Sequence, residues 1–396
     1  MFDTLKAPEP DKIIQLMALF AADTRPTKVD LGVGVYRTPD GRTPVMAAVK
    51  AAETRILAEQ QTKSYVALSG DPAFHDAMRR LILGDVVTAE RVAALATPGG
   101  TGAVRQVLEL TKSINPDATI WLSDPTWPNH PSIVDYLGLT RREYRYYDAQ
   151  TGGLDQAGML ADLAQAKAGD LVLLHACCHN PTGADLSLED WNALADLFEK
   201  TGAIPFVDMA YLGFANSLEE DAAGTRALAA RLPEMLIAAS CSKNFGLYRD
   251  RAGIVLALTS GADAKAAAQG SLSYLNRQNF AFPPDHAARV VETILNDAVL
   301  CDMWRDELRQ MRDGMNEARR LFANTIRTEA GSDRFAFIAA QRGMFSMTGA
   351  SPEQVTQLRD EHGIYLVGDG RMNVAGLTPD SIPVVAKALA QTLTRG

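Results

Sequence analysis

The sequence predicts an α/β fold built on a mostly parallel sheet. Its 396 residues, 47% of them hydrophobic, are enough to bury a large core divided among two or three domains. Through the middle of the chain, short apolar runs alternate with longer helical patterns, as expected of strands joined by crossover helices. The polar motifs follow the apolar runs, and ligands of such sheets bind beyond the carboxyl ends of the strands. We therefore expect a functional site at that edge.

Strands are expected over residues 95–97, 119–122, 171–174, 204–207 and 236–238. Helices are expected over 104–112, 188–200 and 224–232, where Gly202 and Pro233 supply stop signals. After Pro283 and Pro284 the pattern changes to long helices, over 285–296 and 297–327. The remaining residues alternate short apolar runs with one last helix, so they predict a small α+β domain.

Composition and charge exclude several classes of protein. The net charge is -9 and lysine and arginine do not cluster, so we expect neither nucleic acid nor a membrane surface as a partner. The N-terminus lacks the basic start and apolar run of a signal peptide, which favours a soluble, cytoplasmic protein. No metal site is expected. His175, Cys177, Cys178 and His179 crowd together, but adjacent residues of an extended segment point to opposite faces.

Lys243 is the most informative single residue. It follows the apolar run 235–240 and is flanked by Ser242 and Asn244. A lysine that is removed from water has a depressed pKa and becomes a usable nucleophile and base, so this position suits a Schiff-base lysine. A solvated surface lysine is the alternative, and Lys243 alone does not decide between them.

Other motifs also follow apolar runs. Gly99–Gly102 precede a helix, where backbone N–H groups suit a phosphate, although a plain tight turn explains them too. Asn180 offers an amide on a turn stiffened by Pro181, although an Asx-turn uses the same residues.

Asp208 and Trp127 complete this set. Asp208 ends a buried strand, where a carboxylate requires a cation or donors such as a pyridinium N–H, unless it caps the next turn. Trp127, with His130 behind it, suits stacking on a flat ring, although a core tryptophan is the common case. Together these motifs supply an amine, an acid partner, ring donors, a stacking ring and a phosphate cradle. Pyridoxal 5'-phosphate needs those groups, so we predict it as the cofactor.

These motifs also carry a resemblance that covers nearly the whole chain. The matching stretches are 31–36, Tyr65, 99–102, 127–130, 177–183, 208–211, 240–251 and 370–376. The chain resembles a class I aminotransferase of fold type I, in the aspartate and aromatic amino acid subgroup, and is most similar to the bacterial aromatic enzymes. The resemblance implies a large domain with a seven-stranded sheet and a small α+β domain. It divides the chain into an N-terminal arm with part of the small domain (1–43), a large cofactor domain (44–305), and a linking helix with the small C-terminal domain (306–396).

The resemblance also implies roles in cofactor binding. Lys243 forms the Schiff base, Asp208 keeps the pyridine nitrogen protonated, and Tyr211 with Asn180 binds the ring oxygen. Trp127 stacks on the ring. The phosphate is bound by Gly100, Thr101, Ser240, Ser242 and Arg251, with Tyr65 from a second subunit. A homodimer with shared active sites follows.

Two arginines are expected to select the substrate. Arg371 matches the arginine that binds the α-carboxylate through a bidentate fork, a geometry that lysine cannot supply. Arg277 matches the arginine that reaches across the dimer to a dicarboxylate, and Gly34, Trp127 and Asn180 complete the implied substrate site. Leu212 and Phe282 stand where relatives that act on aspartate often have glutamine and asparagine, so the surroundings are more apolar.

We therefore expect amino transfer from tyrosine, phenylalanine and aspartate to 2-oxoglutarate by a ping-pong mechanism. The alternatives are an aspartate aminotransferase with little aromatic activity, and a lyase of the same fold, against which Arg277 argues. A transcriptional regulator would need a DNA-binding segment, and too few residues precede the motif at Leu31 to hold one.

Overall fold

The computed structural model describes residues 2–6, 12–38 and 40–394. Contacts within the chain divide it into two units. The large unit comprises Pro44–Asn180 and Ala184–Gly314, and the small unit comprises Met1–Thr43, Pro181–Gly183 and Met315–Gly396. The three-part division of 1–43, 44–305 and 306–396 stays a prediction.

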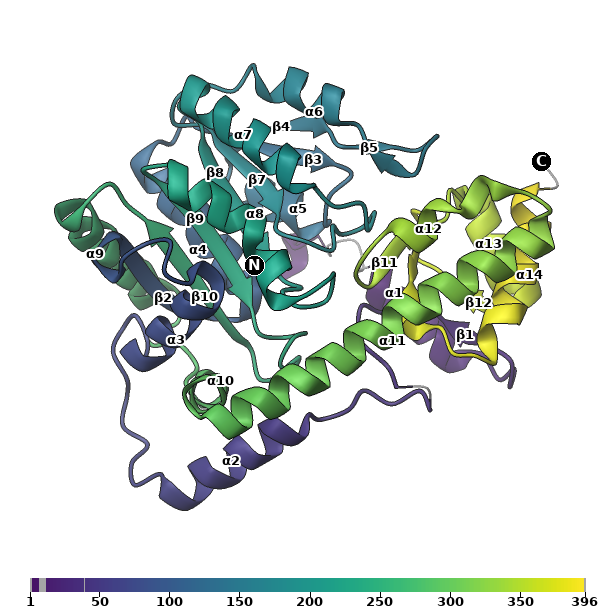
Figure 1. The fold of residues 1–396 in the computed structure, drawn as a ribbon, viewed down its shortest axis with the longest axis horizontal. Coiled ribbons are helices and arrows are strands. Elements are labelled where there is room, and N and C mark those ends of the chain that lie inside the picture. The colour runs from purple at the N-terminus through teal and green to yellow at the C-terminus, as the bar shows by residue number, and fades with distance from the viewer. Residues whose placement is uncertain (1, 7–11, 39, 395–396) are drawn as a thin grey trace. The chain divides into compact units, whose positions relative to one another are not determined.

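A seven-stranded sheet forms the centre of the large unit (Figure 1). Its order is β2 (Val92–Pro98), β10 (Ala252–Leu258), β9 (Met235–Ser240), β8 (Ile204–Met209), β7 (Leu171–His175), β3 (Thr119–Asp124) and β4 (Thr140–Arg145). Only β10 among these strands runs antiparallel to its neighbours. The predicted mostly parallel α/β sheet is confirmed, and the five expected strands lie within β2, β3, β7, β8 and β9.

Two strands of the sheet were not expected. The edge strand β4 has the sequence Thr-Arg-Arg-Glu-Tyr-Arg, and every side chain but Tyr144 is exposed. Because an edge strand meets water, it lacks the apolar run that marks a buried one. The other strand, β10, is buried along its whole length, and its seven-residue run without a charge was a usable signal.

Helices connect and cover these strands. Those of the large unit are α2 (Ala47–Glu59), α3 (Pro72–Leu83), α4 (Gly99–Ile114), α5 (Asn129–Tyr136), α6 (Gln156–Leu163), α7 (Leu188–Thr201), α8 (Leu218–Arg231), α9 (Ala262–Asn279), α10 (His286–Asn296) and the first half of α11 (Ala298–Ala330). Two short strands, β5 (Tyr147–Asp148) and β6 (Gly153–Leu154), form a hairpin. Local signals explain several ends: Ser187 and Asp190 form a capping box on α7, and Gly202 ends it at φ 70°.

The first turn of α4 differs from the expectation. The sequence predicted a helix over 104–112, but α4 begins at Gly99, directly after the last residue of β2. Glycines lower helix propensity, so the pattern hid this turn. Its start is fixed instead by packing, because Val104, Val107 and Leu108 are buried in one core with Ile120 of β3 and Val255 of β10. The helix therefore brings its N-terminus to the edge of the sheet where β2 ends.

The small unit is α+β, as predicted. Besides the second half of α11 it contains η1 (Phe2–Thr4), α1 (Lys12–Ala22), β1 (Val29–Asp30), η3 (Asp333–Phe335), α12 (Phe337–Ala340), β11 (Phe345–Met347), α13 (Pro352–His362), β12 (Ile364–Tyr365), β13 (Arg371–Asn373), η4 (Val374–Gly376) and α14 (Ser381–Thr394). Strands β1 and β12 pair in parallel, and β11 pairs with β13 antiparallel. Within the part of the chain that the structure describes, no helix has the length and apolar character needed to cross a bilayer.

Candidate active site

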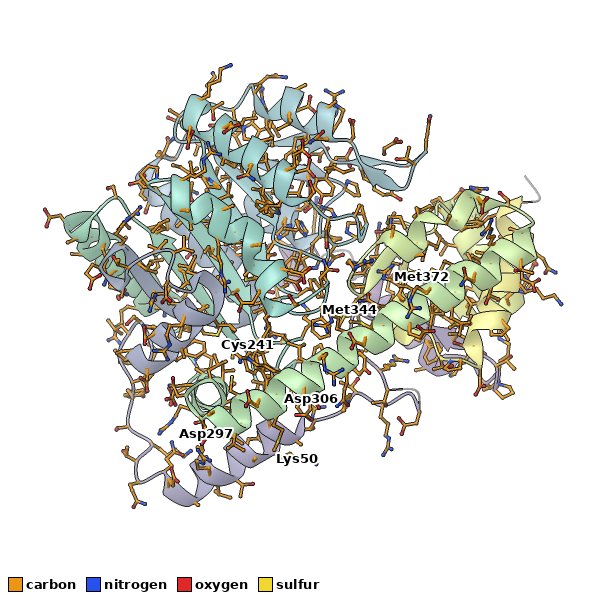
Figure 2. All side chains as sticks on the ribbon, in the orientation of Figure 1. Lys50, Cys241, Asp297, Asp306, Met344 and Met372 are labelled. Carbon is orange, nitrogen blue, oxygen red and sulfur yellow. The ribbon has the colours of Figure 1, made fainter. Side chains whose placement is uncertain are left out.

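The carboxyl ends of the parallel strands carry most of the predicted site residues. Trp127 follows β3, Asn180 follows β7, Asp208 is the fifth residue of β8, and Ser240 ends β9. Cys241, labelled in Figure 2, comes directly after β9 and is fully buried, and Lys243 lies two residues beyond it. All belong to the large unit. The structure therefore gathers them at the edge where the sequence predicted a site.

Lys243 is partly buried and lies against Tyr211. Its Nζ is 4.8 Å from the centroid of the Tyr211 ring, and Tyr211 is itself buried. Burial lowers the pKa of Lys243 from 10.5 to about 8; the negative charge of Asp208 opposes this shift and the positive charge of Arg251 adds to it. Near neutral pH, an appreciable fraction of this amine is therefore neutral and nucleophilic.

Asp208 accepts a hydrogen bond from a buried histidine. His130 Nε2 lies 2.9 Å from Asp208 Oδ2, and the His130 ring is fully buried. Burial by itself raises the pKa of Asp208, but the hydrogen bond from His130 and the positive charge of Lys243 work against it, and the net shift is downward. This carboxylate, whose side chain is 10% exposed, therefore stays ionised.

The bond to Asp208 ends a chain of directed hydrogen bonds. Burial lowers the pKa of His175 to about 3, so this ring is neutral. The Asn180 backbone N–H donates to His175 Nδ1 (3.4 Å), which leaves His175 Nε2 to donate to Thr126 Oγ1 (3.2 Å). Thr126 Oγ1 also lies 2.8 Å from His130 Nδ1, and His130 Nε2 donates to Asp208. The chain thus links the turn at Asn180 to the carboxylate of Asp208.

A cluster of donors surrounds the N-terminus of α4. Pro98, which precedes the helix, provides no side-chain cap for its first N–H groups. A Cβ added at Gly99 would lie 2.3 Å from Arg251 Nη2, and one at Gly100 would lie 2.8 Å from Ser240 Cβ. Arg251 Nη1 in turn donates to Ser242 Oγ (2.9 Å). Only glycine lets the backbone approach this closely, and the cluster combines a helix N-terminus, a guanidinium and two hydroxyls, which suits a phosphate.

The remaining predicted residues of this unit are exposed, except for Trp127, which is partly buried. Thr101 is exposed on the first turn of α4. Trp127 is partly buried and meets the His130 ring edge to face, with centroids 5.2 Å apart. Tyr65 and Arg277 are both exposed and contact the ring of Phe282. In a single chain, therefore, Tyr65 and Arg277 face outward.

Gly34 and Arg371 belong to the small unit and meet at one ring. The guanidinium carbon of Arg371 lies 4.6 Å from the centroid of Phe345, and a Cβ at Gly34 would lie 2.7 Å from Phe345 Cζ. Asn373 holds the segment of Gly34 in place by donating from Nδ2 to Val33 O (2.5 Å). Arg371 is 2% exposed, so its stem and guanidinium are fixed by packing before any ligand arrives.

Sequence reasoning missed three residues of these arrangements. Thr126 and His175 carry the hydrogen-bond chain, and both lie within or beside motifs already recognised for their neighbours. A histidine at the end of an apolar run, as at His175, was a usable signal. Phe345 offered none, because its contacts with Arg371 and Gly34 join segments far apart in the sequence.

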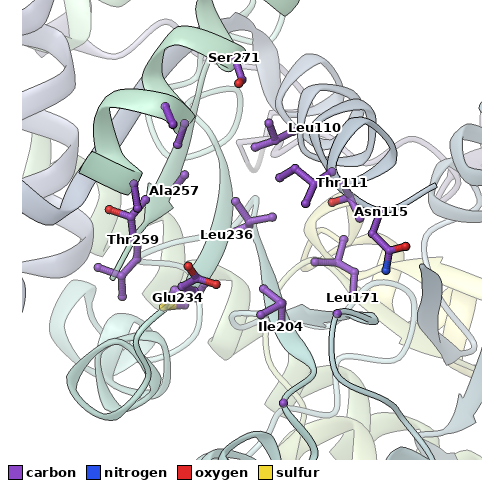
Figure 3. Close-up of a pocket in the computed structure, with 18 residues that line it drawn as sticks. Leu110, Thr111, Asn115, Leu171, Ile204, Glu234, Leu236, Ala257, Thr259 and Ser271 are labelled. Carbon is purple, nitrogen blue, oxygen red and sulfur yellow. The ribbon is translucent and has the colours of Figure 1, made fainter. Parts of the chain in front are cut away.

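A cavity at the opposite edge of the sheet contains none of the predicted residues (Figure 3). Its volume is about 580 Å³, and it is lined by the amino ends of β7, β8 and β9 with residues of α4 and α9. Leu110, Leu171 and Leu236 point into it (Figure 3). Across the described residues, no group of three or more His, Cys, Asp or Glu side chains is arranged to hold a metal ion.

Comparison with known proteins agrees with this geometry. The chain matches the family described as aminotransferase class I and II over residues 26–389. It belongs to that family. The aromatic-amino-acid aminotransferase of Paracoccus denitrificans is 54% identical over 391 residues, 99% of either chain. The aspartate aminotransferase of Salmonella typhi is 42% identical over 396 residues, covering 99% of this chain and 100% of the relative.

A solved structure extends the comparison to the fold and the cofactor. The aromatic-amino-acid aminotransferase of Burkholderia pseudomallei, covalently bound to pyridoxal phosphate, superposes with a TM-score of 0.96 at 38% identity over 99% of either chain. This aminotransferase therefore has the fold type I architecture and uses pyridoxal 5'-phosphate, as predicted. Its residues fit that group, because an amine of lowered pKa, an ionised carboxylate and an anion cradle occupy one edge of the sheet.

Proposed function

We propose that this aminotransferase transfers the amino group of tyrosine, phenylalanine and aspartate to 2-oxoglutarate in a ping-pong cycle, as a cytoplasmic homodimer. The partly buried amine of Lys243, with a pKa of about 8 at the edge of the sheet that also carries Asp208, is the observation that carries the proposal. When bound, pyridoxal phosphate supplies an electron sink for charge that develops at the substrate Cα.

The residues of the large unit would hold the cofactor at five points. Lys243 provides the covalent anchor, and Asp208 pairs with the protonated pyridine nitrogen through a carboxylate that His130 keeps ionised. Tyr211 and Asn180 would bind the ring oxygen, and Trp127 would stack on the ring. The phosphate is bound by the first turn of α4 and its neighbours, namely Gly100, Thr101, Ser240, Ser242 and Arg251.

Lys243 also moves the proton of the reaction. As a free amine, Lys243 would accept the proton that leaves the substrate Cα. A base with a pKa of about 8 suits this role, because an amine with the ordinary lysine value of 10.5 is almost wholly protonated at neutral pH. The Tyr211 ring, against which Nζ lies, limits where the amine travels.

Two arginines orient the substrate. Arg371 binds the α-carboxylate with a fork that is already fixed against Phe345, and thereby presents Cα–H rather than the carboxylate bond for cleavage. Gly34 has no side chain, and a Cβ at this position would strike the Phe345 ring that contacts the Arg371 guanidinium. Arg277, which is exposed in the single chain, reaches the distal carboxylate of a dicarboxylate bound to the partner subunit, and Tyr65 likewise joins the partner's phosphate site.

The aromatic part of the specificity is supported by two observations. Leu212, an apolar residue that is 2% exposed, directly follows Tyr211 in the chain. The relative at 54% identity is an aromatic-amino-acid aminotransferase. An aspartate aminotransferase with little aromatic activity is the competing function, and relatives of that name reach 42% identity.

A panel of amino donors tests the proposal. Aspartate, tyrosine, phenylalanine, tryptophan and kynurenine are compared by kcat/KM with 2-oxoglutarate as acceptor, and both products are measured. We expect aspartate, tyrosine and phenylalanine to be used, with one glutamate formed for each oxo acid. Strong aspartate turnover without tyrosine turnover would establish the competing function. Product release without any oxo-acid acceptor would instead indicate a lyase.

A further inference from the structure

The segment that follows Arg277 contains a strained turn. The Phe282 N–H donates to Phe280 O at 2.8 Å, which closes a three-residue turn around Ala281. Ala281 has φ 65°, in the left-handed region that a residue with a side chain rarely occupies. Turns of this type with a positive central φ are rare and strained, and such strain persists only where the surroundings impose it. The turn directs the chain sharply just before Pro283, which restricts Phe282 to an extended conformation.

The turn brings the Phe282 ring onto two exposed residues. Tyr65 stacks on it, with centroids 4.5 Å apart and ring planes 13° from parallel. The guanidinium carbon of Arg277 lies 5.8 Å from the centroid of the same ring. In the single chain Tyr65 is 82% exposed and Arg277 is also exposed, so burial within the chain does not force this arrangement. Neither a hydrogen bond nor an ion pair joins Arg277 to any residue in the described ranges, which leaves the aromatic face as its contact.

We propose that Phe282 is a positioning residue that holds Arg277 on its ring and thereby shifts donor preference from dicarboxylates toward aromatic amino acids. This inference rests on the proposed function, in which Arg277 binds the distal carboxylate. A guanidinium over an aromatic face is attracted by the ring quadrupole, and this attraction is lost each time Arg277 extends to a carboxylate. Aspartate must therefore compete with Phe282 for Arg277.

An aromatic donor has the opposite requirement. Its ring would bury a guanidinium that extends into the same pocket, and a cation without a partner is costly to remove from water. A guanidinium that stays on Phe282 avoids this cost. Stacking by Tyr65 keeps the Phe282 ring in place. The ring is therefore in position to receive the guanidinium again after Arg277 has extended to a carboxylate. The Phe282 ring and the distal carboxylate of the substrate thus compete for the Arg277 guanidinium.

Two substitutions at Phe282 separate the ring face from its bulk. Phe282→Leu removes the aromatic face and keeps an apolar side chain, whereas Phe282→Tyr keeps the face and serves as the matched control. For Phe282→Leu we expect the ratio of kcat/KM for aspartate to that for phenylalanine to rise about two- to fivefold, the size of one exposed cation–π contact. The change should appear as a lower KM for aspartate with kcat unchanged, because Arg277 binds substrate and transition state alike. Phe282→Tyr should leave the ratio unchanged.

Measuring Phe282→Leu in an Arg277→Ala background shows whether Phe282 acts through Arg277. There the substitution should no longer change the ratio. An unchanged ratio in the first comparison, or an equal loss for both donors, would overturn the inference and assign Phe282 a structural role only. A shift that persists without Arg277 would overturn it as well. If no donor transfers its amino group in the unsubstituted protein, the proposed function fails instead, so the two failures are distinguishable.

Discussion

At the scale of single residues, the reactivity of Lys243 follows from where its amine lies. Burial disfavours the ammonium form, and the positive charge of Arg251 adds to that effect. Asp208 works against the shift, so the pKa stops at about 8 rather than falling further. The amine is thus neutral often enough to react and basic enough to accept a proton.

This lysine should give the cofactor-free protein a recognisable pH profile. The rate at which it captures pyridoxal phosphate, followed by absorbance, should level off above about pH 8 to 9 and be about tenfold lower at pH 7, because only the neutral amine reacts. Lys243→Ala is the control and should show no capture at this site. A rate that keeps increasing beyond pH 10 would mean that Lys243 has an ordinary pKa.

The same shift affects stability with a definite sign. The folded protein loses the Lys243 proton near pH 8, whereas the unfolded chain holds it up to about 10.5. The unfolded state therefore binds more protons than the folded state between pH 8 and 10.5. As a result, the free energy of unfolding of the cofactor-free protein should rise with pH across this range, and it should be lower below pH 8.

At the scale of elements, the first turn of α4 depends on residues without side chains. Gly99→Ala should weaken cofactor binding by tenfold or more, because the added Cβ would lie 2.3 Å from Arg251 Nη2 and would displace that guanidinium. Cofactor dissociation constants, measured by fluorescence titration, check this. Gly270→Ala is a matched control at an exposed position of α9, where an added Cβ meets nothing within 4 Å. It should leave binding unchanged and raise stability by about 0.5–1 kcal/mol.

The second element-scale prediction concerns Arg319 on α11. This side chain is fully buried in the small unit and donates to Gly343 O (2.7 Å), Phe345 O (2.5 Å) and Ser346 Oγ (2.6 Å). Arg319→Met removes these donors and leaves buried acceptors unsatisfied, so the unfolding free energy should fall by about 3 kcal/mol or more. Denaturant unfolding checks the change, with Arg320→Met as the exposed neighbour. A loss of less than 1 kcal/mol would mean that water replaces the guanidinium.

At the scale of the whole molecule, the exposed position of Arg277 predicts shared active sites. Lys243→Ala should abolish aspartate turnover, and Arg277→Ala should reduce it strongly. Each mixed dimer of the two variants has one site with both residues intact, provided that Arg277 serves the partner's site. Random exchange of subunits should therefore restore about one quarter of the normal activity.

The control for this experiment mixes each variant with itself under the same conditions, and sedimentation measures the dimer. Activity that stays at the level of the separate variants would mean that Arg277 serves its own subunit.

Some features were predictable because they depend only on residues that are close together in the sequence. Apolar runs of the buried strands and the polar residues directly after them identified Asp208, Asn180 and Lys243, since parallel strands all end at one edge. Other features were not local. The start of α4 at Gly99 was hidden by low helix propensity, and the polar edge strand β4 lacked an apolar run.

By itself, the sequence determined which chemical groups this protein has and at which edge of its sheet they gather, because it fixes which residues follow each strand and parallel strands all end at one edge. Only the tertiary structure decided the hydrogen-bond partners, the ring contacts and the pKa shifts of those groups. His130 meets Asp208 across 78 positions of sequence, and Thr126 meets His175 across 49. The turn at Ala281 places Phe282 on Tyr65 and Arg277. Hydrogen bonds, burial and ring contacts depend on distances in space, and packing sets those distances.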